Sequence, residues 1–186
     1  GVVASKIQLE GPIKKGKTSY LVAGRFAYPG AVLNVLKQFR GTKMSFYDGN
    51  AKINSTLNDR NRIFFSVYNG GDHTFFNQLV RSYGMNWGNT TATFRWNHVW
   101  TDRLSGNFSA IFSNYYYRYK SITDGMKFLW KSNIQSYQLK YDADYAVNNV
   151  LHIRSGLSAH VFTTMPGSIS SWGDFSNVVP YRMDRR

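Results

Sequence analysis

Four histidines are the residues of this sequence best suited to hold a metal ion. They are His73, His98, His152 and His160. No two of them have the spacing of a metal-binding motif. His152 and His160 fall on one face of a predicted strand but about 26 Å apart, at about 3.3 Å per residue. The sequence therefore predicts no metal site and no cofactor.

A catalytic triad is the second chemistry to consider. Asp72 and His73 are adjacent, and Ser66 and Ser82 are near them in the sequence. The nucleophile elbow and oxyanion-hole motif that accompany such serines in hydrolases are missing from these segments. Chance explains the grouping better, so we expect no catalytic residues and no enzyme activity.

A hairpin over residues 135–163 is the clearest structural signal. Odd positions from Tyr137 to Tyr145 are apolar, whereas even positions from Ser136 to Asp144 are polar or charged. The segment after residues 147–149 alternates in the same way. A period of two over about ten residues per arm predicts two antiparallel strands and a short turn.

The length of these arms favours a membrane setting. Strands in soluble domains usually have about 5–6 residues, whereas a tilted strand that crosses a bilayer needs about 9–11. We expect a wall whose apolar side faces lipid and whose polar side faces water. The net charge of +13 predicts an anionic partner: lipid headgroups, nucleic acid or an acidic ligand. The absence of cysteine excludes disulfides and thiolate metal sites.

The turns recur at a constant pitch along the chain. Short turns are predicted near residues 14–16, 58–61, 101–106 and 147–149, and centres at residues 15, 59, 103 and 148 are 44, 44 and 45 residues apart. Long loops are predicted near residues 29–41, 72–86, 121–131 and 165–186, the first with a short helix. Alternating short turns and long loops are typical of an all-β, antiparallel up-and-down transmembrane β-barrel.

Aromatic residues are expected to form two girdles, one near each end of the strands. Their rings favour a membrane–water interface because they join an apolar body to a polar edge. The members are Trp96, Trp100, Tyr141 and Tyr145 towards the short turns, and Trp87, Tyr115, Tyr117, Tyr119 and Trp130 towards the loops. Cross-strand pairing in a soluble sheet is the alternative explanation.

Four segments resemble barrel strands of TonB-dependent outer-membrane receptors, especially nutrient importers of the Bacteroidetes type. They are residues 19–25 (SYLVAGR), 46–54 (FYDGNAKIN), 58–66 (NDRNRIFFS) and 87–97 (WGNTTATFRWN). The resemblance implies that residues 1–186 are a β-barrel segment, about eight contiguous strands of a 22-stranded barrel in the bacterial outer membrane. It also implies as partners the rest of the barrel, a plug domain, an inner-membrane energy-coupling protein, outer-membrane lipid and a surface substrate-binding lipoprotein.

The polar strand positions are expected to face the lumen or the plug. They are Asp48, Asn50, Lys52, Asn54, Arg95, Asn97, Lys140, Asp142, Asp144 and Arg154. They contact a transported ligand or, as we favour, form a structural charge ladder between strands and plug. On the long loops, Trp172, Phe175 and Tyr181 are candidates to stack on a sugar or peptide, or to pack the loop.

Three functions remain open from the sequence. The first is part of a receptor that imports a glycan, peptide or metal chelate. The second is a self-contained eight-stranded outer-membrane barrel that acts as an adhesin or anchor, which requires the first and last strands to pair. The third is a soluble basic β protein that binds nucleic acid, which we disfavour because Lys and Arg alternate with acids on the strand faces.

Overall fold

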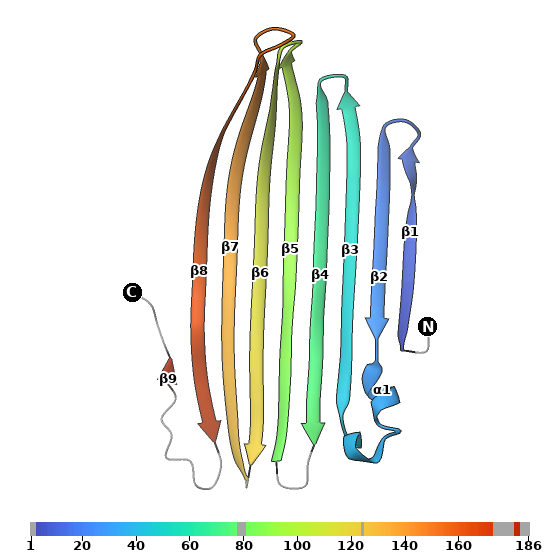
Figure 1. Ribbon diagram of the computed structural model, residues 1–186, viewed down its shortest axis with the longest axis vertical. Coiled ribbons are helices and arrows are strands. Elements are labelled where there is room, and N and C mark those ends of the chain that lie inside the picture. Colours follow the sequence, from blue (N-terminus) through green and yellow to red (C-terminus); the bar gives the residue numbers. More distant parts are fainter. Residues whose placement is uncertain (1–2, 78–80, 124, 173–180, 183–186) are drawn as a thin grey trace.

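The computed structural model describes residues 3–77, 81–123, 125–172 and 181–182. In these residues, nine strands form one antiparallel sheet whose spatial order is the chain order (Figure 1). The strands are β1 (Ala4–Lys14), β2 (Thr18–Ala27), β3 (Lys43–Asn58), β4 (Asn61–Asn77), β5 (Arg81–Thr101), β6 (Leu104–Thr123), β7 (Met126–Ala146), β8 (His152–Trp172) and β9 (Tyr181–Arg182). The prediction of an all-β, up-and-down arrangement is confirmed.

The connection between β2 and β3 contains the predicted short helix. It is α1 (Pro29–Leu33), followed by a 3₁₀ turn at Lys37–Phe39. The Asn34 side-chain amide donates to the carbonyls of Gly30 and Thr42, both at 2.7 Å. These bonds fold the connection against the start of β3. No helix among the described residues is long and apolar enough to cross a membrane.

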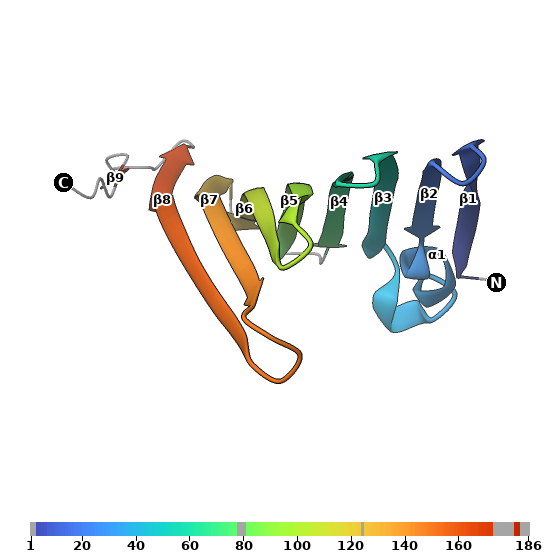
Figure 2. The ribbon, with the colours of Figure 1, turned by 90° about the horizontal axis from the view of Figure 1, so that it is seen from above.

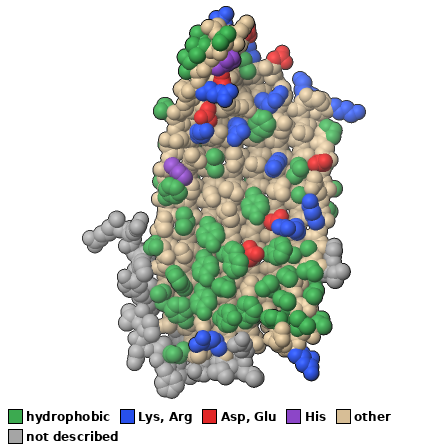
Figure 3. Space-filling model, viewed as in Figure 1, with side chains coloured by type: hydrophobic (Ala, Val, Ile, Leu, Met, Phe, Trp, Pro, Cys, Tyr) green, Lys and Arg blue, Asp and Glu red, His purple; other side chains and the backbone are tan. Residues whose placement is uncertain are grey.

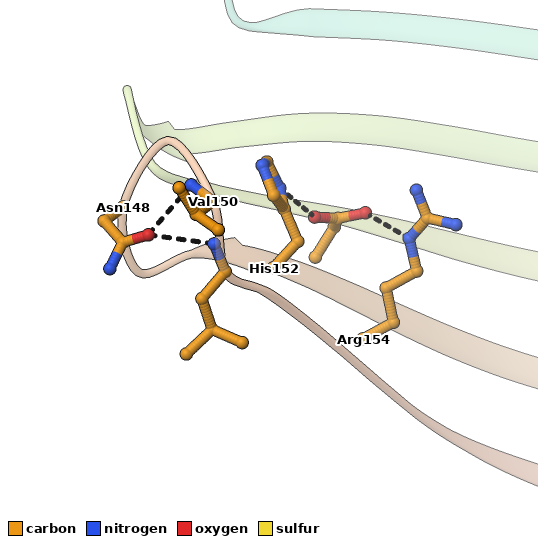
Figure 4. A network of polar contacts seen from close by, with 6 residues as sticks. Asn148, Val150, His152 and Arg154 are labelled. Carbon is orange, nitrogen blue, oxygen red and sulfur yellow. Dashed lines mark hydrogen bonds and ion pairs between the residues drawn. The ribbon is translucent and has the colours of Figure 1, made fainter.

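Short turns join the strands at the predicted places. Asp102 and Arg103 alone separate β5 from β6, so the turn predicted at residues 101–106 is shorter than expected. At the β7–β8 turn, the Asn148 side-chain oxygen accepts hydrogen bonds from the main-chain N–H groups of Val150 (2.9 Å) and Leu151 (2.8 Å) (Figure 4). Asparagine is favoured in such turns because its side chain replaces a missing main-chain acceptor.

The described residues of three predicted long loops are almost all strand, so those predictions were wrong for the residues that the structure describes. β4 and β5 run through residues 72–77 and 81–86, β6 and β7 through 121–123 and 126–131, and β8 through 165–172. Main-chain hydrogen bonds continue the ladder there whatever the side chains are. In these segments aromatic and polar residues occur on both faces, so apolar and polar residues do not alternate. The strands therefore continue where the sequence no longer shows the pattern that predicts a strand.

The sheet is open in the described part of the chain. Viewed from above, β1 and β8 lie at opposite ends of the row of strands (Figure 2). β1 pairs with β2 alone, and β8 pairs with β7 and, at Ser168 and Ile169, with β9. The β1–β8 pairing that an eight-stranded barrel requires is therefore not present in the described residues. Among the described strands, the outer edges of β1 and β8 have no further strand partner apart from β9 at Ser168 and Ile169, so additional strands could extend the sheet there.

The sheet also has no hydrophobic core of its own. Ala27 is the one buried hydrophobic residue among those described, while Leu157 is 80% exposed and Ile7 is 65% exposed. A sheet gains stability when it buries an apolar face against another layer. A layer outside these residues must therefore cover at least one face.

Two glycines admit aromatic rings at the centre of the sheet. One row of directly paired residues crosses β3 to β6 and consists of Tyr47, Gly71, Gly88 and Tyr116. A Cβ atom on Gly88 would lie 2.7 Å from the Tyr116 ring and 2.8 Å from the carbonyl oxygen of Gly70. A Cβ atom on Gly71 would lie 3.0 Å from the Tyr47 ring. Glycine is needed here so that the rings can lie flat on the strands.

We expect Gly88→Ala to destabilise the protein by about 1–3 kcal/mol because its methyl group would overlap both the ring and a main-chain oxygen. Denaturant unfolding of the purified protein measures this. Gly49→Ala is the matched control, since the nearest atom to its added Cβ is the Ala23 oxygen at 3.8 Å. Equal stability of the two variants would contradict the proposed close packing.

Candidate functional site

The strand register sorts side chains into two faces that continue from strand to strand. One row of neighbouring partners crosses seven strands, and we call it the Trp96 row: Thr18, Ser55, Ile63, Trp96, Phe108, Tyr141 and Leu157. The face that carries this row is the apolar face. Its neighbouring rows add Leu9, Val22, Ile53, Phe65, Val67, Phe94, Phe112, Leu139 and Val161. The opposite face is the polar face.

Acidic residues are confined to the polar face in the described strands. They are Glu10, Asp48, Asp72, Asp142 and Asp144. All ten residues predicted to face a lumen or plug also lie on this face: Asp48, Asn50, Lys52, Asn54, Arg95, Asn97, Lys140, Asp142, Asp144 and Arg154. The structure thus places the predicted set together on one surface.

Ion pairs connect several members of this set. Arg25 and Asp48 are register partners on β2 and β3, and their side chains approach to 2.6 Å. Arg154 lies 2.7 Å from Asp144, which also lies 3.8 Å from His152 (Figure 4). Lys140 and Asp142 pair along β7 at 2.9 Å. These contacts match the charge ladder favoured from the sequence, because each links charges on the same face.

The aromatic residues of the predicted loop-side girdle lie on the opposite face of the sheet from those of the turn-side girdle. Each of these rings is an odd number of residues away from the apolar positions of its own strand, and the register between β5, β6 and β7 is continuous over this region. The residues are Trp87, Tyr115, Tyr117, Tyr119 and Trp130. They therefore lie on the polar face. The prediction was wrong because it counted distance from the turns and ignored the alternation. Trp96, Trp100, Tyr141 and Tyr145 do lie on the apolar face.

Together these loop-side rings and Phe128 make an aromatic patch on the polar face. The Tyr117 and Trp130 rings pack edge to face at 6.4 Å, and those of Tyr119 and Phe128 at 6.2 Å. Tyr115 and Trp130 are each 41% exposed. The space-filling view of this face shows most charged side chains over the turn-side half and hydrophobic ones gathered towards the loop end, with a few charged side chains among them (Figure 3). Rings presented in this way can stack on a flat or ring-shaped ligand.

A different aromatic row marks the loop-side limit of the apolar face. It contains Phe26, Tyr47 and Tyr116, with Gly71 and Gly88 between the tyrosines. The sequence did not reveal this row, because each strand contributes a single ring and only the pairing register brings the rings together. At the other limit, the Asn61 side-chain oxygen accepts from the Trp96 indole N–H at 3.0 Å and contacts the His98 ring nitrogen at 2.7 Å.

Two hollows on the apolar face are lined mainly by hydrocarbon. One, of about 690 Å³, lies over Gly24 and Gly49 and is bordered by Ile7, Val22 and Phe26. The other, of about 350 Å³, lies over three alanines between aromatic rings: Ala92, Ala110 and Ala159. Small residues between large ones leave grooves that flexible apolar chains can fill. The polar face has a hollow of about 540 Å³ beside Asn107, Asp142 and Arg154.

Each hairpin extends further past the Trp96 row than the hairpin before it. Partners in this row are four residues apart in the first hairpin (Lys14 and Thr18) and eight in the second (Ser55 and Ile63). They are twelve apart in the third (Trp96 and Phe108) and sixteen in the fourth (Tyr141 and Leu157). The tips thus advance two residues per hairpin, or one per strand, as the rising row of turns shows (Figure 1). An advance of one residue per strand corresponds to a rise of about 3.3 Å for each strand spacing of about 4.8 Å. If all the tips lie in one plane, the strands are therefore tilted by about 35° from the normal to that plane.

The apolar face shifts in the same direction. On β2 the apolar face ends at Tyr20, which is two residues from the Trp96 row towards the loops. On β7 it ends at Tyr145, which is four residues from the same row towards the turns.

On β5 the hydrophobic side chains of this face run from Trp100 to Ala92, which is eight residues, about 26 Å along the strand and about 22 Å along the normal at this tilt. We call this stretch the apolar band. A polar row with Asn69, Thr90 and Asn114 separates it from the aromatic row. The turns and the apolar band are therefore consistent with one tilt.

The predicted ligand-loop residues are only partly covered by the structure. Trp172 is the last residue of β8 and Tyr181 belongs to β9, so neither is in a loop. Phe175 lies outside the described residues. No group of three or more His, Asp or Glu residues in the described ranges is placed to hold a metal ion.

No family model, no curated protein and no solved structure matches the chain.

We expect Asp48→Asn to lower the free energy of unfolding by about 0.5–1 kcal/mol, because its partner Arg25 is half-exposed and solvent screens the pair. Unfolding in low and high salt measures this, and the difference from the parent protein should shrink as salt rises. Asn50→Ala, on the same face but outside the charge pairs, is the control. A decrease of more than about 3 kcal/mol in the free energy of unfolding that does not depend on salt would contradict this, because it is the behaviour of a buried ion pair.

Proposed function

We propose that this chain is part of the wall of a transmembrane β-barrel in the bacterial outer membrane, with the apolar face towards lipid and the polar face towards an aqueous lumen. One observation carries the proposal: the hairpin tips and the apolar band advance together by about one residue per strand. Strands of membrane barrels tilt by about 35–45°, and their apolar bands are about 25 Å high. The tilt of about 35° and the height of about 22 Å agree with both values.

The exposure of the apolar face supports a lipid environment. Large side chains such as Leu157 and Val161 are 80% and 62% exposed, and the face has no acidic residue in the described strands. Water would make such a surface unfavourable by about 25 cal/mol per Å² of apolar area. Acyl chains would cover it without a fixed shape, and the two hollows over glycine and alanine could accept them.

The open edges support a barrel larger than eight strands. With β1 and β8 unpaired to each other, further strands are needed to satisfy their main-chain groups within a membrane. On the resemblance of its strand motifs, we propose that the barrel is a TonB-dependent receptor that imports a nutrient. The plug, the energy-coupling protein and a surface lipoprotein would be its partners. The aromatic patch would meet the nutrient at the loop end, while the charge ladder stabilises the turn side.

We expect Leu157→Arg to reduce the folded protein recovered from outer membranes, because a charge near the midplane of the lipid face costs about 2–4 kcal/mol. Leu157 is 80% exposed, so on a soluble sheet the same change would cost within about 0.5 kcal/mol. Ser158→Arg, the next residue and on the polar face, is the matched control. Detergent extraction of membrane fractions gives the measurement. Equal recovery of both variants, or extraction without detergent, would contradict the proposal.

Tryptophan fluorescence tests the same orientation without a change of charge. In single-tryptophan variants, with Phe at the other positions, Trp96 should be quenched by brominated lipid and Trp130 by aqueous iodide. Trp96 lies on the apolar face and Trp130 on the polar face. Quenching of both tryptophans by iodide alone would contradict a lipid-facing apolar surface.

A further inference from the structure

Five cations gather at the loop end of the apolar face, just beyond the row of Tyr47 and Tyr116. We call them the basic strip: Lys43, Arg118, Lys120, Lys127 and Lys131. Arg118 and Lys131 are direct register partners on β6 and β7. Lys120 lies two residues further along β6, and its row continues through Gly84 and Phe75 to Lys43. All five side chains are exposed.

The basic strip differs from the cations of the polar face in its lack of acidic neighbours. Arg25, Lys140 and Arg154 each have a carboxylate within 3 Å on their own face. No acidic residue of the described strands lies on the apolar face, and none of the five strip residues takes part in an ion pair found in that part of the chain. Like charges directly opposite each other on a sheet are unfavourable. An anion from outside would remove this cost.

The position of the strip selects the kind of anion. It lies next to the aromatic row of Phe26, Tyr47 and Tyr116, on the side away from the apolar band. The Arg118 guanidinium lies 5.4 Å from the centre of the Tyr116 ring. This cation–π contact holds the guanidinium beside the aromatic row while its N–H groups can still donate to phosphate oxygens. An occupant that joins acyl chains to phosphates would cover both surfaces at once.

We propose that the basic strip binds the phosphate groups of an anionic membrane lipid, specifically one that carries two phosphates and whose acyl chains lie on the apolar face. The inference rests on the proposed function, because it requires the apolar face to be in lipid. Arg118 and Lys131 bind one phosphate as neighbours across the ladder, and Lys120 with Lys127 on the neighbouring strand binds a second. Lys43, three strands away, adds to the positive charge of the strip. Each cation close to an anionic lipid surface strengthens binding by about fivefold. Part of the chain's net charge of +13 is thereby explained.

The test compares lipids that differ in phosphate number. Protein purified from membranes in mild detergent is titrated with diphosphoryl lipid A, monophosphoryl lipid A and phosphatidylcholine, and bound lipid is counted by native mass spectrometry. We expect the diphosphoryl form to bind most tightly. Arg118→Gln with Lys131→Gln should weaken its binding by about 25-fold and bring it close to the monophosphoryl form.

Arg95→Gln with Lys52→Gln is the matched control, since it removes the same charge from the polar face. Equal weakening by the control pair, or affinity that does not depend on phosphate number, would overturn the proposal. So would complete competition by millimolar inorganic phosphate, which would indicate a free-phosphate site, or tighter binding of a short oligonucleotide. If the protein extracts only with detergent but shows none of the lipid dependence, this inference fails while the proposed function stands.

Discussion

Main-chain hydrogen bonds between neighbouring strands hold every functional surface of this molecule in place. The ladder runs from β1 to β8 with register shifts only near Pro12, Thr56, Val99 and Lys131. Because the register is otherwise continuous, the alternation of side chains on one strand is passed to the next. The apolar face, the charge ladder, the aromatic patch and the basic strip all follow from this single constraint. A shift by one residue between any two strands would place carboxylates such as Asp142 on the apolar face.

The sequence predicted the fold class, the turns and the division of polar from apolar residues. This succeeded where the two faces differ strongly, as in residues 135–163, where Tyr137 to Tyr145 alternate with Ser136 to Asp144. It failed where both faces carry similar residues. Tyr115 to Tyr119 lie in an unbroken strand, but four of those five positions are tyrosine, so alternation gives no signal and a loop was predicted to follow at residue 121. Only the pairing partners reveal that the strand continues.

The aromatic residues illustrate a second limit of sequence analysis. The distance of a ring from a turn indicates how far along the strand the ring lies. The face on which it lies follows only from the number of residues between it and a residue of known face on the same unbroken strand. Trp87 and Trp96 are nine residues apart on β5 and therefore lie on opposite faces. The basic strip was missed for a related reason. Lys43, Arg118 and Lys131 are distant in the sequence, and only the register brings them together.

The division of the polar face into two halves has a physical explanation within the proposed barrel. On the turn side, ion pairs such as Arg154–Asp144 bind strand to strand, and water in the lumen lowers the cost of leaving their charges exposed. On the loop side, the rings of the aromatic patch are uncharged and have Asp72 beside Trp87 as a charged neighbour, so most of the patch would offer a neutral ligand stacking surfaces without the cost of removing a charge from water. A ligand that enters from the loop end would meet rings first and charges afterwards. Weak, exchangeable stacking at the entrance and polar contacts deeper in the lumen would let it move inwards without being trapped at its first contact.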